Sequence, residues 1–176
     1  DRDGKYQLTM LSHSAFAPLA ESVTAMLKEE FFHMFTGHTG LTRILRAGKI
    51  PIPIVQKYFN KWLSTAYDLF GTDHSSSAHW TYTWGLKGRF DEHEATLPAE
   101  KDRLNDLARS HYMAESDKLI DQLNQLIPAD QPKLYAPDLK FNRSIGEYVG
   151  KTYSVTGESL TPEEYQKHLS DALPTT

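Results

Sequence analysis

The stretch that decides the fold is PLAESVTAMLKEEFFHMFTGHTGLTRILRA, residues 18–47. A set of mostly apolar residues recurs in it at steps of three and four, and this spacing places their side chains on one face of an α-helix. Pro18 is typical of a first helical turn and Gly48 of a helix end, so the sequence predicts one long helix between them. The expected inward face carries Leu19, Val23, Met26, Leu27, Glu30, His33, Met34 and Gly37.

Two polar residues, Glu30 and His33, interrupt this apolar stripe. They lie three residues apart and therefore point to the same side of the helix. A carboxylate on a buried face is costly unless it is paired or bound to a metal. An inward Glu-x-x-His is one half of the ligand set of ferritin-like di-iron carboxylate proteins, where carboxylates hold and bridge the ions and imidazole caps each one. The motif is short, so the alternative is a solvent-facing Glu30 and a structural His33.

A further carboxylate comes from the start of the chain. Residues 5–13 predict a short helix with Leu8 and Leu11 on one face, and the same stripe would include Asp1. If the chain turns back near residues 14–17, about twelve residues separate the turn from Asp1 and from Glu30, so both lie roughly 18–20 Å from it. Asp3 is the alternative and fits slightly less well. The sequence therefore predicts a site formed by Asp1 or Asp3 with Glu30 and His33.

The remainder of such a site, another carboxylate and a second Glu-x-x-His, is not found in the sequence. His111 with Glu115 and Glu164 with His168 are spaced by four, and we interpret both pairs as structural. A complete centre must therefore use helices from elsewhere. The chain opens Asp1-Arg2-Asp3-Gly4 without a Met and enters a helical pattern at once, which favours a piece of a longer protein.

The rest of the chain divides into a helical part and an irregular part. Helices are expected over residues 54–70, 74–86 and 98–127, with a strand over 79–84 as the alternative for part of the second. Pro and Gly break every period from residue 128 onward. Short strands or irregular arms are expected over 133–155, followed by a final helix to about residue 172. The expected buried side of the helix over 98–127 carries Leu104, Leu107, His111, Ala114, Leu119, Leu123 and Leu126.

Composition excludes several classes of function. The 176 residues are 39% apolar and 24% charged, which argues against disorder and against a membrane protein. A net charge of −4 gives no basic field to hold nucleic acid. There is no cysteine, so thiolate metal sites, disulfides and Cys nucleophiles are excluded, and any redox chemistry must draw electrons from another polypeptide or a carrier. A cytoplasmic location is expected.

Three blocks carry a family resemblance: KEEFFHMFTGHTGLTRILRAGKIPIPIVQKYFNKWLSTAYDLFGTDHSSSAHW at 28–80, WGLKGRFDE at 84–92 and QPKLYAPDLKFNRSIGEY at 131–148. Together they closely resemble the oxygenase subunits of the benzoyl-CoA 2,3-epoxidase family, over essentially the whole chain. The resemblance implies an all-α, ferritin-like bundle holding two irons. It implies a monooxygenase that uses O₂, and electrons from an NADPH-dependent flavin and iron–sulfur reductase, to epoxidise the ring of benzoyl-CoA in aerobic benzoate degradation.

The resemblance also assigns residues and domains. Family iron ligands correspond to Asp1, Glu30 and His33, and family members are more than twice as long as this chain. Residues 1–127 are then the C-terminal half of the ferritin-like domain, and 128–176 are an irregular extension with a short C-terminal helix. The implied partners are the missing N-terminal half, the reductase and benzoyl-CoA, without nucleic acid or membrane. The alternative function is a metal-free helical scaffold or interaction module.

Substrate contacts are the least defined part of the site. Arg43, Arg46 and Lys49 cluster before a Pro-rich connector and could meet the CoA phosphates, which suit Arg and Lys by charge and geometry. The alternative is a solvated face. The three tryptophans are expected in the core rather than as a platform for adenine; they are Trp62, Trp80 and Trp84.

Overall fold

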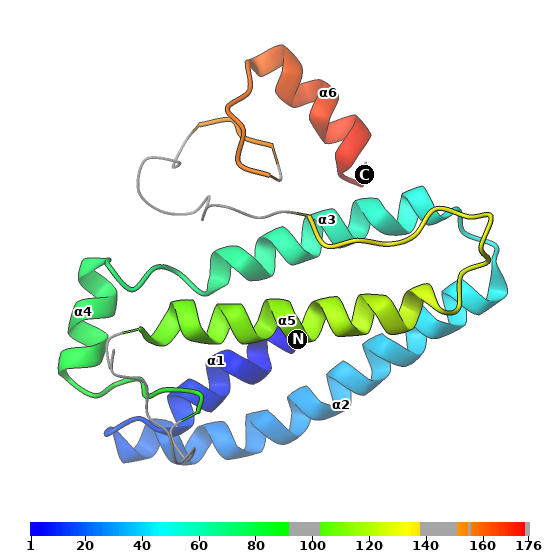
Figure 1. The fold of residues 1–176 in the computed structure, drawn as a ribbon. Coiled ribbons are helices and arrows are strands. Elements are labelled where there is room, and N and C mark those ends of the chain that lie inside the picture. Colours follow the sequence, from blue (N-terminus) through cyan, green and yellow to red (C-terminus); the bar gives the residue numbers. More distant parts are fainter. Residues whose placement is uncertain (92–102, 138–150, 155, 175–176) are drawn as a thin grey trace. The chain divides into compact units, whose positions relative to one another are not determined.

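The computed structural model describes residues 1–91, 103–137, 151–154 and 156–174. These ranges form α1 (Arg2–Ser12), α2 (Ala17–Ala47), α3 (Ile52–Leu69), α4 (Ser76–Thr83), α5 (Leu104–Asn124) and α6 (Pro162–Ala172) (Figure 1). Within them the only β-type pairing is an isolated antiparallel bridge between Tyr153 and Ser159. The all-α prediction is confirmed, and the helices are consistent with part of a ferritin-like bundle. The expected helix start at residues 98–102 lies outside the described residues.

The chain groups into two compact units. The first unit contains Asp1–His38 and Phe70–Met113, and the second contains Thr39–Leu69 and Ala114–Thr176. The long helices α2 and α5 therefore each contribute residues to both units. The domain boundary that the sequence analysis places between residues 127 and 128 is a different division from these two units, and it stays a prediction.

In the first unit, α1 and α2 form the predicted antiparallel hairpin. The amide of Ser14 donates to the carbonyl of Leu11, and the Ser14 hydroxyl accepts from the amide of Phe16, which closes the turn. The residues of α1 that become fully buried are Tyr6 and Met10, not the pair expected from the apolar stripe. Leu8 and Leu11 remain half-buried, because the contacts of Tyr6 with other aromatic rings, described next, determine which face of α1 is buried.

Aromatic rings fill the centre of the first unit. The ring of Tyr6 lies edge-on to Phe90 at 5.5 Å and to Tyr112 at 6.3 Å between centroids, and Tyr112 contacts Phe70 at 5.3 Å. Such edge-to-face pairs are favourable beyond the area that they bury. Because Tyr6 lies on α1 and Tyr112 on α5, these contacts connect the first helix with the fifth.

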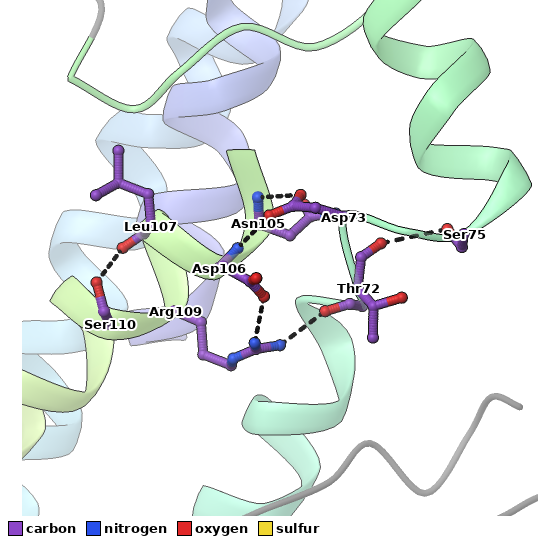
Figure 2. Close-up of polar contacts among 9 residues, drawn as sticks. Thr72, Asp73, Ser75, Asn105, Asp106, Leu107, Arg109 and Ser110 are labelled. Carbon is purple, nitrogen blue, oxygen red and sulfur yellow. Dashed lines mark hydrogen bonds and ion pairs between the residues drawn. The ribbon is translucent and has the colours of Figure 1, made fainter. Parts of the chain in front are cut away.

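The N-terminus of α5 is capped by a carboxylate that is distant in sequence. The two oxygens of Asp73 accept from the amides of Asn105 at 2.8 Å and Asp106 at 2.9 Å, as Figure 2 shows. Arg109, one turn into the helix, donates to the carbonyl of Gly71 at 2.8 Å and pairs with Asp106. These bonds satisfy amides that a helix start leaves without intrahelical acceptors, and they fix where α5 begins.

The buried face of α5 differs in part from the predicted one. Leu104 and Leu123 are buried as expected, whereas His111 and Ala114 are exposed, contrary to expectation. A helical period allows two neighbouring stripes, and the packing of Tyr112 against rings of the first unit selects the stripe one position further along. The buried residues in this stretch are Leu104, Asn105, Ala108, Tyr112, Ser116, Ile120, Leu123 and Ile127.

The second unit has an aliphatic core in which a buried amide is fully hydrogen-bonded. Gln56 on α3 donates to Asn60 Oδ1 and to the carbonyl of Tyr135, both at 2.9 Å, and accepts from the amide of Tyr135 at 3.0 Å. Asn60 in turn donates to the carbonyl of Ala172, which ties α3 to the end of α6. The core cluster comprises Leu45, Ile52, Val55, Ile120, Leu123, Ile127 and Leu134.

The three tryptophans are not core residues, contrary to prediction. Trp62, Trp80 and Trp84 are 57–67% exposed, and Trp80 and Trp84 lie edge-on to each other with their ring centroids 6.3 Å apart. The α4 helix buries no residue at all. On α2, the aromatic residues Phe31, Phe32 and Phe35 are similarly exposed. Despite these apolar surfaces, no helix in the described ranges has the length and apolar character needed to cross a bilayer.

Candidate metal centre

The hairpin of α1 and α2 brings together the three residues that the sequence singled out. Asp1 is the N-cap of α1, and Glu30 and His33 lie one turn apart on α2. Each of the three side chains offers one ligand atom, and these atoms all lie within 4.8 Å of one another. The antiparallel register therefore places both helices at one level, as the residue count predicted. A function of these residues as metal ligands stays a prediction.

Glu30 is the best-enclosed member of the group. Its side chain is 20% exposed, and its Oε2 atom is buried without a hydrogen-bond donor in the described part of the chain. His33 Nδ1 lies 4.0 Å from Oε2, beyond hydrogen-bonding distance. Glu30 thus turns inward, which contradicts the alternative of a solvent-facing residue. The other two side chains are more open, with His33 50% and Asp1 62% exposed.

The structure also separates the two acids that the sequence left as alternatives. The ligand group contains Asp1 and not Asp3. Asp1 is therefore the better-placed carboxylate on α1.

The donor set fits a first-row metal ion such as iron. Two carboxylates and one imidazole are hard and borderline donors of the kind that non-haem iron prefers. A cation between them would give the buried Glu30 oxygen a close partner, which His33 Nδ1 at 4.0 Å does not provide. Two six-coordinate ions need more donors than three side chains provide, so these residues fit one part of a two-metal centre. No other group of three potential ligands meets the same distance criterion within the described ranges.

The cationic residues suggested for substrate binding lie elsewhere along the chain. Arg43 and Arg46 are exposed near the C-terminal end of α2, and Lys49 is exposed in the connector to α3. Lys49 borders a cavity of about 410 Å³ in the second unit, whereas the two arginines do not line it. The cavity is lined by Leu45, Gly48, Lys49, Ile50, Pro51, Ile52, Ile127, Pro128 and Gln131. Binding of CoA phosphates by the three cations stays a prediction.

Sequence reasoning missed two residues of the first unit. Lys87 donates to Gln7 Oε1 at 2.9 Å and to Asn105 Oδ1 at 2.8 Å. Burial lowers the pKa of its ammonium to about 8, against the opposing effect of the Asp73 charge. Gly4 lies against the Glu30 carboxylate. The sequence did contain a signal for Gly4, because a glycine stands close to the start of the first predicted helix, level with Glu30.

Comparison with known proteins gives one informative relative. No family model matches the chain. The chain is 30% identical to a protein named benzoyl-CoA oxygenase component B from Aromatoleum evansii, in an alignment of 220 residues. The alignment covers 99% of this chain and 46% of that protein, so the chain spans about half the length of the curated relative it matches. Nearly all of this chain is thus similar to one part of an oxygenase component, which suggests the benzoyl-CoA oxygenase family.

Proposed function

We propose that this chain contributes part of the metal centre of a di-iron, O₂-dependent monooxygenase that forms the 2,3-epoxide of benzoyl-CoA. The observation that carries the proposal is the convergence of Asp1, Glu30 and His33 around a buried carboxylate oxygen without a hydrogen-bond donor. The similarity to benzoyl-CoA oxygenase component B supports the substrate class.

In this proposal the three side chains hold and orient metal. The di-iron centre, when bound, supplies the redox chemistry with O₂ that protein side chains cannot provide. Glu30 offers an oxygen from the enclosed side of the hairpin, and the more open Asp1 and His33 close the group toward solvent. The aromatic contacts of Tyr6 with Phe90 and Tyr112 hold α1, the helix that begins at Asp1, in place.

The remaining ligands would come from a polypeptide region that this chain does not contain. We propose that the region matches the unaligned part of component B and carries the further carboxylate and Glu-x-x-His. Residues 1–127 then form the C-terminal half of a ferritin-like domain, with 128–176 as an extension. The assembly works in the cytoplasm with a separate NADPH-dependent flavin and iron–sulfur reductase. Because this chain has no cysteine, a thiolate-ligated cluster must belong to that partner.

Iron content combined with turnover tests the proposal. The chain should bind iron weakly by itself and form no epoxide, whereas an assembly with the complementary region should bind about two irons and epoxidise benzoyl-CoA with O₂ and the reductase. Glu30→Ala should abolish iron binding and turnover while circular dichroism shows nearly unchanged helix content. Glu29→Ala is the matched control, because Glu29 is exposed on the same helix.

Two results would contradict the proposal: full activity of the Glu30→Ala assembly, or tight binding of two irons by the isolated chain. A folded assembly that contains no iron would instead favour the metal-free scaffold. That alternative draws on the exposed surface of Phe31, Phe32 and Phe35, which a protein partner could cover.

A further inference from the structure

Gly4 lies on the face of α1 that meets Glu30. A Cβ atom built on Gly4 would lie 3.0 Å from both Cδ and Oε1 of Glu30 and 3.3 Å from Oε2. Ordinary contacts of a Cβ atom begin at about 3.4 Å. A Cβ atom at position 4 would therefore require the Glu30 carboxylate to move by a few tenths of an ångström.

The backbone gives no separate reason for glycine at this position. Gly4 is inside α1 and is not among the glycines with positive φ. Alanine is more favourable than glycine inside a helix, so the sequence forgoes helix stability here. The helical glycines of α2 provide a contrast, because a Cβ atom on Gly37 or Gly40 would meet nothing within 4 Å.

We propose that Gly4 is a positioning residue of the metal centre. Its missing side chain lets the Glu30 carboxylate lie against α1, close to Asp1 and His33, and a methyl group there would displace the carboxylate by a few tenths of an ångström relative to the other two ligand atoms. The inference rests on the proposed metal-binding function. It adds that the close approach of α1, and not the side chain of Glu30 alone, determines where the carboxylate is held.

The first test measures the contact without metal. In EDTA, Gly4→Ala in a Glu30→Ala background should raise the melting temperature by about 2–4 °C, because only the gain in helix propensity remains. In the wild-type background the same substitution should give a smaller rise or a decrease, because the methyl group meets the carboxylate. Gly40→Ala should give equal shifts in both backgrounds. Equal shifts for Gly4→Ala would overturn the inference.

The second test measures the positioning effect. Titration of the chain with Co²⁺, followed by its visible absorption, should show weak binding by the wild type and roughly 10–100-fold weaker binding by Gly4→Ala, the range found for residues that orient metal ligands. Gly40→Ala should match the wild type. Equal affinities for the wild type and Gly4→Ala would overturn the role of Gly4 while the metal site stands. Absence of Co²⁺ binding by the wild type, with the melting shifts as expected, would overturn the metal site and with it the positioning role.

Discussion

Gln56 in the second unit and Glu30 in the first are both polar side chains turned toward a packed face of a helix, but their partners differ. Gln56 is 8% exposed, donates to two carbonyl-type oxygens and accepts from an amide. Glu30 is 20% exposed, and its buried Oε2 atom has no hydrogen-bond donor in the described part of the chain. A buried polar group that serves packing is normally hydrogen-bonded, so the bare oxygen of Glu30 favours a role in binding.

The contrast is not a general feature of the first unit. Arg89 there forms a buried two-point pair with Asp91, with N–O distances of 2.8 and 2.9 Å. These hydrogen bonds hold the pKa of the Asp91 carboxyl below its ordinary value. Lys87 and Asp73 have partners as well. The first unit can complete its buried polar groups, which makes the exception at Glu30 more informative.

The largest effect on stability is expected at Gln56. Gln56→Leu removes three buried hydrogen bonds and leaves the amide and carbonyl of Tyr135 without these partners, so the free energy of unfolding should fall by about 3 kcal/mol. Urea denaturation measures this loss. Gln122→Leu on an exposed face of α5 should stay within about 0.5 kcal/mol of the wild type. If Gln56→Leu lowers the free energy of unfolding no more than Gln122→Leu does, the hydrogen bonds of Gln56 do not stabilise the fold and the contrast with Glu30 fails.

The Lys87 ammonium is buried and hydrogen-bonded, and the free-energy cost of burying its charge depends on pH. Its pKa is about 8 in the folded chain and 10.5 in its ordinary state, so below pH 8 both states are protonated and the burial cost is fully present. Between pH 8 and 10.5 the folded state loses the proton first, and the free energy of unfolding should rise by about 2 kcal/mol after allowance for partial exposure.

Denaturation curves at several pH values measure that rise. Lys87→Met should remove it, whereas Lys118→Met, at an exposed position of α5, should keep it. If the difference in unfolding free energy between the wild type and Lys87→Met does not change with pH over this range, burial of the Lys87 charge carries no cost.

The cap of α5 gives a smaller expected effect and a direct counterpart to Glu30. Asp73→Ala removes the acceptor of two helix-end amides, so the free energy of unfolding should fall by about 1–2 kcal/mol. Thermal denaturation is the measurement, with Asp130→Ala in the exposed loop after α5 as the control. An Asp73→Ala chain as stable as the control would contradict a capping role for this carboxylate.

The sequence predicted the parts of the site that depend on local rules. Helix ends at Pro18 and Gly48, and the break in an apolar stripe at Glu30, were enough to predict the hairpin and the inward carboxylate. The buried face of α5 and the exposure of Trp62 depend on which helices meet, so periodicity could not fix them. Gly4 was missed for the same reason, because its importance is a distance between two helices.

Glu30→Gln should have the smallest effect on stability, and it tests the unpartnered side of the comparison. The substitution keeps the length and shape of the side chain and removes a charge that has no hydrogen-bond donor at Oε2. Without metal, the free energy of unfolding should therefore stay unchanged or rise by up to about 1 kcal/mol, since a charged oxygen enclosed without a hydrogen-bond donor is costly. Urea denaturation in EDTA measures this value, and the same experiment with Co²⁺ should stabilise the wild type but not the variant, because a ligand that binds only the folded state adds to its stability. A loss of more than about 1 kcal/mol in EDTA would mean that Glu30, like Gln56 and Asp73, is there for packing.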